Sequence, residues 1–219
     1  MHARSIVFRW TVAGLAAASV VVVAGCSDRS GTGSTTTATT MPTTSMSGMA
    51  QSSSRQAPTR TDFNDADVTF LQEMYPHHAQ AVQMADLAPA RTQNQQILQL
   101  APEIKNAQQP EMTQISSLLQ QFGKPVPSAD TGGMQNMPGM ANMPGMMSTQ
   151  QMQDLQSKSG SDFDRMFLSM MIEHHAGAIK MAKTEQAQGV NPDARKLADS
   201  VVTSQQAEID RMKAMLGQR

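Results

Sequence analysis

The C-terminal part of the chain has apolar residues at the spacing of two amphipathic helices. The first stripe follows the period of one buried helix face. Its positions are Phe167, Leu168, Met171, Ala178, Ile179 and Ala182. Gly189 favours a helix end, and Asn191 followed by Pro192 favours the start of a second helix. A second stripe follows at Leu197, Val201, Ile209, Met212 and Met215. The pattern therefore predicts a helical hairpin.

The same pattern occurs 97 residues upstream, because residues 62–122 align without a gap on residues 159–219. The paired positions include Asp67 with Asp164, Phe70 with Phe167, Met74 with Met171, His77-His78 with His174-His175, Met84 with Met181, and Glu111 with Glu208. A match of this length indicates internal duplication. Two such hairpins bury their apolar stripes best as a four-helix bundle, so we expect an all-α fold. Pro76, Pro102 and Pro110 favour kinks or short breaks in the first copy.

The first 25 residues have the layout of an export signal. Arg4 and Arg9 precede an uncharged apolar run, which is too short for a comfortable membrane span. The run ends in Val23-Ala24-Gly25-Cys26, and these four residues resemble a bacterial lipobox. The resemblance implies cleavage before Cys26, lipid attachment to Cys26, and an extracytoplasmic protein anchored to the membrane of a bacterial cell envelope. An uncleaved anchor helix is the alternative.

Residues 26–61 are rich in Ser, Thr and Gly and have few large apolar side chains. Such a segment cannot bury enough surface to offset its chain entropy, so it predicts a disordered tether. A random coil of this length spans roughly 30 Å. We therefore expect residues 62–219 to form one folded domain, with a connection at residues 123–158 between the two repeats.

Composition narrows the classes of function. The 219 residues include 17 Lys+Arg and 18 Asp+Glu, for a formal net charge of -1, which argues against a nucleic-acid binder. A single Cys excludes an intramolecular disulfide framework and a multi-thiolate zinc site. The chain has 20 Met, far more than core filling usually requires.

The four His residues outside the export signal form two matched His-His pairs. On a helical wheel, Asp67, Met74 and His78 share the centre of the inward stripe. His77 and Met84 lie together at its edge. The second copy repeats this arrangement with Asp164, Met171, His175, His174 and Met181. Imidazole, thioether and carboxylate groups near one another suit a transition metal, so the sequence predicts a metal site in the bundle.

A structural interpretation of the same residues is also open. Met at helical spacing usually forms core, and a single inward His is more often a hydrogen-bonded core residue than a ligand. Asp67 and Asp164 could be first-turn acids stabilised by the helix dipole, and Ser161 with Asp164 resembles a capping box. The presence of two matched His-His pairs favours the metal site.

The connection between the repeats contains a second candidate site. Asn136-Met137-Pro138-Gly139-Met140 is followed by Asn142-Met143-Pro144-Gly145-Met146. Pro-Gly favours a turn that folds the flanking thioethers toward one centre, and the soft thioether selects Cu(I). We therefore expect Met137, Met140, Met143 and Met146 to bind Cu(I). An oxidation-scavenging or low-complexity linker is the alternative. Ser148 and the helix formers after it predict a short helix.

Two runs carry a resemblance to a known family. They are Phe70-Leu71-Gln72-Glu73-Met74-Tyr75-Pro76-His77-His78-Ala79-Gln80-Ala81 and the segment from Phe163 to Ala182 around His174-His175. Both resemble the bacterial ferritin-like family catalogued as domain of unknown function 305. The resemblance implies a ferritin-like four-helix fold, export and, in several members, an association with copper. By motif match it implies a ligand set of His77, His78, His174, His175, Met74, Met84, Met171 and Met181.

These observations lead to one preferred function and two alternatives. We expect an extracytoplasmic, lipid-anchored protein that buffers copper or hands it on, with Cu(I) as the main species. Its partners would be the membrane, the copper ion and a copper-handling envelope protein, with no nucleic acid. A metal-free interaction scaffold and a copper-dependent oxidoreductase are the alternatives. The chain lacks the Glu-x-x-His pattern of di-iron bundles. It also lacks His-Glu-x-x-His, Gly-x-Ser-x-Gly and a phosphate-binding glycine loop, so no enzyme is expected.

Overall fold

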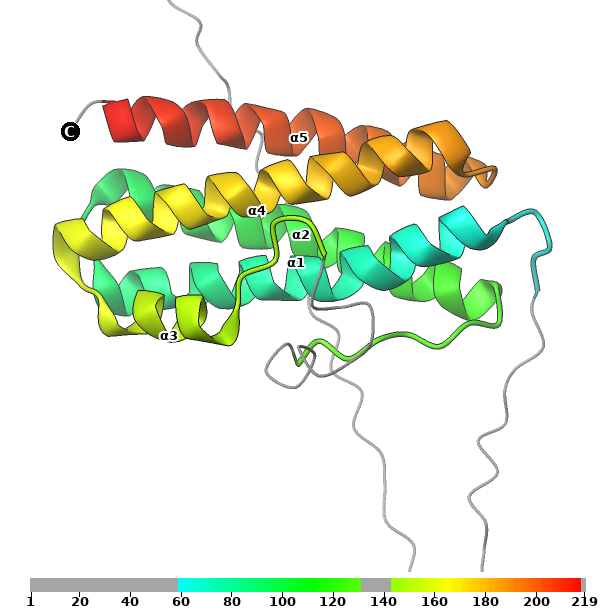
Figure 1. Cartoon of the computed structure of the whole chain (residues 1–219), viewed down its shortest axis with the longest axis horizontal. Coiled ribbons are helices and arrows are strands. Elements are labelled where there is room, and N and C mark those ends of the chain that lie inside the picture. The colour runs from blue at the N-terminus through cyan, green and yellow to red at the C-terminus, as the bar shows by residue number, and fades with distance from the viewer. Residues whose placement is uncertain (1–58, 131–142, 218–219) are drawn as a thin grey trace, which may run out of the picture. The chain divides into compact units, whose positions relative to one another are not determined.

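The computed structural model describes residues 59–130 and 143–217. In these residues all regular secondary structure is helical (Figure 1), with α1 (Asp65–Arg91), α2 (Gln95–Gln121), α3 (Thr149–Ser157), α4 (Gly160–Gln188) and α5 (Pro192–Gly217). The hairpins α1–α2 and α4–α5 form the predicted bundle, and the short helix α3 follows Ser148 as expected. Within this part of the chain, no helix has both the length and the apolar character that crossing a bilayer requires.

Several sequence-based expectations lie outside the described residues. These are the export signal, the tether up to residue 58 with Cys26, and the first Met-Pro-Gly-Met unit with Met137 and Met140.

The helix ends confirm one predicted cap and correct another. Asn191 caps α5 as expected, because its side-chain oxygen accepts hydrogen bonds from the backbone N–H groups of Asp193 (3.1 Å) and Ala194 (3.0 Å). The capping box expected at Ser161 and Asp164 is wrong. Helix α4 begins at Gly160, before Ser161, and its N-cap makes no side-chain hydrogen bond.

The prolines of the first repeat do not break its helices. α1 contains Pro76 and Pro89, α2 contains Pro102 and Pro110, and each helix continues for 27 residues. Pro102 and Pro110 are exposed, so water can reach the carbonyls that lose a backbone partner there. The predicted short breaks are therefore absent.

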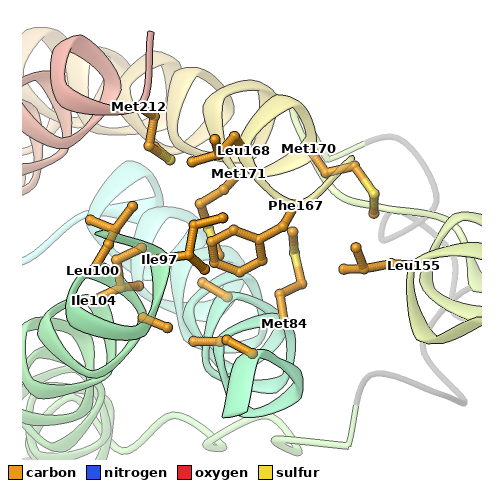
Figure 2. Packing of buried hydrophobic residues seen from close by; sticks show 14 of the residues in the cluster. Met84, Ile97, Leu100, Ile104, Leu155, Phe167, Leu168, Met170, Met171 and Met212 are labelled. Atoms are coloured by element: carbon orange, nitrogen blue, oxygen red, sulfur yellow. The ribbon is translucent and has the colours of Figure 1, made fainter. Parts of the chain in front are cut away.

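Two groups of buried side chains form the core, and each draws on both repeats. The first core cluster includes Met84, Ile97, Leu100, Ile104, Met147, Leu155, Phe163, Phe167, Met171 and Met212. The second core cluster includes Phe70, Leu71, Met74, Ile115, Leu119, Met181, Leu197 and Val201. Figure 2 shows side chains of α1, α2, α4 and α5 converging in the first cluster, with Leu155 reaching it from α3. The repeats are thus held together by shared burial of their apolar stripes.

Candidate metal centre

The two His-His pairs lie in α1 and α4 and are completely buried. All four side chains are 0% exposed, although helical-wheel reasoning put His77 and His174 at the edge of the stripe. The rings of His77 and His174 lie 3.7 Å apart between centroids, with their planes tilted by 35°. The edge position is buried because α1 packs against both α2 and α4. The residues at the edge therefore make the contact between the repeats.

Each inward histidine is hydrogen-bonded to a glutamate of its own hairpin. Nε2 of His78 lies 2.7 Å from Oε2 of Glu111 in α2. Nε2 of His175 lies 2.6 Å from Oε2 of Glu208 in α5. The two pairs are equivalent in the duplication. A carboxylate accepts this hydrogen bond from the N–H of Nε2, which leaves Nδ1 as the ring nitrogen without that contact.

His77 has the same arrangement with a different acceptor. Its Nε2 lies 3.0 Å from the carbonyl oxygen of Pro144. A carbonyl can only accept, so Nε2 of His77 is protonated and its Nδ1 carries the lone pair. His174 differs, because neither of its ring nitrogens makes a hydrogen bond of full geometry, and the nearby backbone of His77 is a weak acceptor for its ring.

The remaining ring nitrogens are buried and unpartnered. They are Nδ1 of His77, His78, His174 and His175, together with Nε2 of His174. A buried polar atom without a partner is costly and calls for an explanation. Histidines that bind metals typically donate the other ring N–H to a carboxylate or a backbone carbonyl. Three of the four rings have this arrangement, so the donor set fits a metal ion.

Burial also keeps the central pair neutral. Loss of solvation, with a smaller contribution from neighbouring His78, lowers the pKa of His77 to about 3. Loss of solvation, followed by the charge of His77, lowers the pKa of His174 well below its ordinary value. A neutral imidazole offers a lone pair, and a protonated one does not. Both rings are therefore available as ligands at neutral pH.

The histidines need a further donor to hold a metal. Within residues 59–130 and 143–217, no three His, Cys, Asp or Glu side chains are grouped to hold an ion by themselves. The rings of His77 and His174 are tilted by 35° at a centroid distance of 3.7 Å, which leaves little room for an ion between them.

Thioethers lie one helical turn before the central histidines. Met74 precedes His77 by three residues, and Met171 precedes His174 by three, a spacing that brings side chains together on a helix face. Met74 and Met171 are 0% exposed. Met84 and Met181 lie two turns beyond the histidines and are also buried.

The duplication pairs these methionines across the repeats. Met74 packs in the second core cluster with Met181. Met171 packs in the first core cluster with Met84, where both side chains approach Phe167 (Figure 2). Each cluster therefore holds one candidate methionine from each repeat.

The second Met-Pro-Gly-Met unit is docked against the histidines. We call residues 143–147 the strap. In Figure 1 the segment before α3 rises to the middle of α4 and turns back to α3. Met143 is 6% exposed and Met146 is half-buried. The structure thus brings one half of the predicted loop site to the bundle site.

Asp67 and Asp164, which the sequence analysis also names as candidate ligands, accept hydrogen bonds at the ends of the helices. Asp67 accepts hydrogen bonds from the backbone N–H groups of Asn64, Val190 and Asn191. Asp164 accepts from the hydroxyl of Thr92 and the amide of Asn94. Each carboxylate therefore holds the inter-helix loop of the opposite hairpin. Each lies ten residues before its His-His pair, or about 15 Å along the helix.

Sequence reasoning missed five residues of this site. Glu111 and Glu208 match each other in the repeat alignment, and that match was the available signal. Gln80, Pro144 and Gly177 act through the strap, and no local pattern in the sequence reveals its docking.

Comparison with known proteins places the chain in a family. The Domain of unknown function (DUF305) family matches residues 67–216. A structure described as a candidate secreted DUF305 protein from Streptomyces coelicolor is 31% identical, with a TM-score of 0.62, and the match covers 70% of this chain and 93% of that one. A DUF305 fragment from Deinococcus radiodurans is 30% identical, with a TM-score of 0.64 and coverages of 73% and 100%.

The copper protein CopM is also similar. Its Cu(II)-bound form is 33% identical, with a TM-score of 0.58 and coverages of 68% of this chain and 94% of that one. CopM has also been solved in Cu(I)-bound and Ag-bound forms. No curated protein matches this chain. With its duplicated helical hairpins and matched His-His pairs, this chain belongs to the DUF305 family.

Proposed function

We propose that this protein binds copper outside the cytoplasm, as a lipid-anchored protein that buffers the ion or hands it on. The bundle site would use imidazole nitrogens of His77 and His174 with thioether donors from the adjacent methionines. The observation that carries the proposal is the buried, neutral His77–His174 pair with unpartnered nitrogens. Imidazole and thioether together suit copper, and thioether favours Cu(I).

The comparisons support the choice of metal. CopM shares the fold at 29–33% sequence identity, and it has been solved with Cu(I), Cu(II) and silver. Silver(I) resembles Cu(I) in its preference for soft donors. The Met-rich connection, with Met137, Met140, Met143 and Met146, would add soft donors outside the bundle.

Export and anchoring belong to the same proposal. The Val23-Ala24-Gly25-Cys26 run supports lipid attachment at Cys26, and residues 26–61 would then separate the domain from the membrane. The similar Streptomyces protein is described as a candidate secreted protein, which supports a place outside the cytoplasm. Thioethers stay available there because they do not form disulfides.

Titration of the purified protein with Cu(I) against a competing chelator tests the proposal. We expect stoichiometric binding, with loss of the bundle component in His77→Ala/His174→Ala. Replacing Met137, Met140, Met143 and Met146 by Leu should remove the loop component and keep the bundle component. A protein that fails to compete with the chelator, or a double histidine variant that binds like the wild type, would contradict the proposal.

A further inference from the structure

We infer that the strap positions His77 as a ligand, through the carbonyl oxygen of Pro144. The inference rests on the copper site proposed above and adds a regulatory element to it. Docking of a Met-Pro-Gly segment on the bundle would set the tautomer and orientation of one imidazole of the central pair.

The first argument comes from the partners of the three oriented histidines. His78 and His175 donate to Glu111 and Glu208, which the duplication supplies within each hairpin. His77 donates to Pro144, which lies in the connection between the repeats. The bundle repeats therefore do not orient His77 by themselves. Because such outer partners fix the tautomer and direction of a ligating ring, the strap completes the site.

The second argument is the close approach of two backbones. A Cβ atom on Gly177 would lie 2.0 Å from the carbonyl oxygen of Pro144 and 2.7 Å from Cα of Gly145. A Cβ atom on Gly145 would lie 2.9 Å from the backbone oxygen of His174. Gly145 also has a φ of 75°, which side chains disfavour. Only glycine at both positions allows the strap to reach His77.

The third argument is a buried pair of hydrogen bonds at the other end of the strap. The side-chain amide of Gln80 donates to the carbonyl oxygen of Met147 at 2.9 Å. Its side-chain oxygen accepts from the N–H of Met147 at 2.7 Å. Gln80 is 3% exposed and Met147 is 2% exposed. If the strap left this position, the buried amide of Gln80 would lose both hydrogen-bond partners, which is costly. The two hydrogen bonds therefore favour the docked position of the strap.

Docking of the strap and binding of copper should therefore be coupled. Loss of an outer partner of a ligating histidine typically reduces metal affinity about 10–100-fold. Coupling between two binding events is reciprocal. If the docked strap raises copper affinity by a given factor, bound copper should raise the equilibrium constant for strap docking by the same factor.

The test uses one variant that displaces the strap and one matched control. Gly177→Ala introduces a methyl group where the carbonyl of Pro144 lies. Gly217→Ala, also on a helix, places its methyl group in open space. Competition titration with Cu(I) should show about a tenfold loss for Gly177→Ala and no change for Gly217→Ala. In the wild type, hydrogen exchange at the Met147 amide should slow by a similar factor when Cu(I) is bound.

A second variant covers a folding failure. Gln80→Leu removes both hydrogen bonds to Met147 and leaves Gly177 unchanged, so it carries the test if Gly177→Ala does not fold. The inference is overturned if folded Gly177→Ala releases the Met147 amide to fast exchange and still binds Cu(I) like the wild type, or if folded Gln80→Leu gives a mixture of His77 tautomers and still binds Cu(I) like the wild type.

A metal-free measurement separates this inference from the proposed function. Nitrogen-15 NMR of the metal-free wild type should find His77 with its proton on Nε2, and Gly177→Ala should give a mixture of tautomers. This result would support the positioning role even if the wild type failed to bind Cu(I). An unchanged His77 tautomer in Gly177→Ala, with fast exchange at the Met147 amide, would overturn it.

Discussion

Gln80 and Gly177 occupy the same position in the two repeats and act on opposite ends of one segment. Gln80 hydrogen-bonds both backbone groups of Met147. Because Gly177 has no side chain, the backbone of Pro144 and Gly145 can pack directly against α4. The bundle is duplicated, but the strap is single. Divergence at this one pair of positions therefore makes the two central histidines unequal, because only His77 gains the strap carbonyl of Pro144 as a partner.

The glutamate partners of the inward histidines should be equivalent in their effect on stability. Glu111→Leu would leave Nε2 of buried His78 unpartnered, and Glu208→Leu would do the same to His175. We expect each change to lower the free energy of unfolding by about 1–3 kcal/mol in urea denaturation. Glu111→Gln and Glu208→Gln keep an acceptor and should cost less. A Gln variant that costs as much as its Leu counterpart would show that the hydrogen bond is not the cause.

The carboxylates at the helix starts should matter for folding and not for copper. Asp67→Ala removes the acceptor for backbone N–H groups of Asn64, Val190 and Asn191. A loss of about 3 kcal/mol in the free energy of unfolding is expected. Copper affinity of the folded variant should equal that of the wild type. A clear drop in affinity with unchanged stability would restore Asp67 to the ligand set.

Glu185 should make stability depend on pH. Burial, with the adjacent Asp67 carboxylate as a smaller cause, raises the pKa of Glu185 from 4.5 to about 8. The folded state therefore binds more protons than the unfolded state between these values, and this contribution to stability is complete below pH 4.5. It declines as pH rises and is lost above pH 8.

Glu185→Gln removes this dependence and keeps a similar volume beside Gly189. Between pH 5 and pH 8 the wild type should lose more unfolding free energy than the variant does. The expected change is on the order of 2–4 kcal/mol. Urea denaturation at several pH values measures it, and titrations common to both proteins cancel. A difference that stays constant with pH would refute the assignment.

The methionines one turn from the histidines should contribute most to copper affinity. Met74→Leu/Met171→Leu preserves volume approximately, so the core should lose less than about 1.5 kcal/mol per site. We expect at least a tenfold loss in Cu(I) affinity, which is about 1.4 kcal/mol. Met212→Leu, a buried methionine of α5 in the first core cluster, is the control. Equal affinities for the two variants would assign Met74 and Met171 to the core alone.

The bundle could be predicted from the sequence because its apolar residues recur at helical spacing and the pattern occurs twice. The stripe from Phe167 to Ala182 and the alignment of both repeats are local patterns, and Gly189 with Asn191-Pro192 marks a boundary by backbone chemistry. The start of α4 was misplaced because the Ser161 spacing matched a capping box, whereas Asp164 bonds to Thr92 and Asn94 across the bundle.

The site was only partly predictable because its geometry depends on packing between elements. A helical wheel assigns one buried face, so it placed His77 and His174 at an edge. Helix α1 has neighbours on two sides, and that edge became the contact between repeats. The docking of Pro144 depends on a glycine 33 residues later, at position 177, and no sequence period connects the two.

X-ray absorption at the copper edge of protein loaded with one equivalent of Cu(I) tests the central claim most directly. The account predicts a coordination sphere with both nitrogen and sulfur donors, and a loss of the nitrogen component in His77→Ala/His174→Ala. A wild-type site made of sulfur alone, or a spectrum that the two histidine changes leave unaltered, would contradict it.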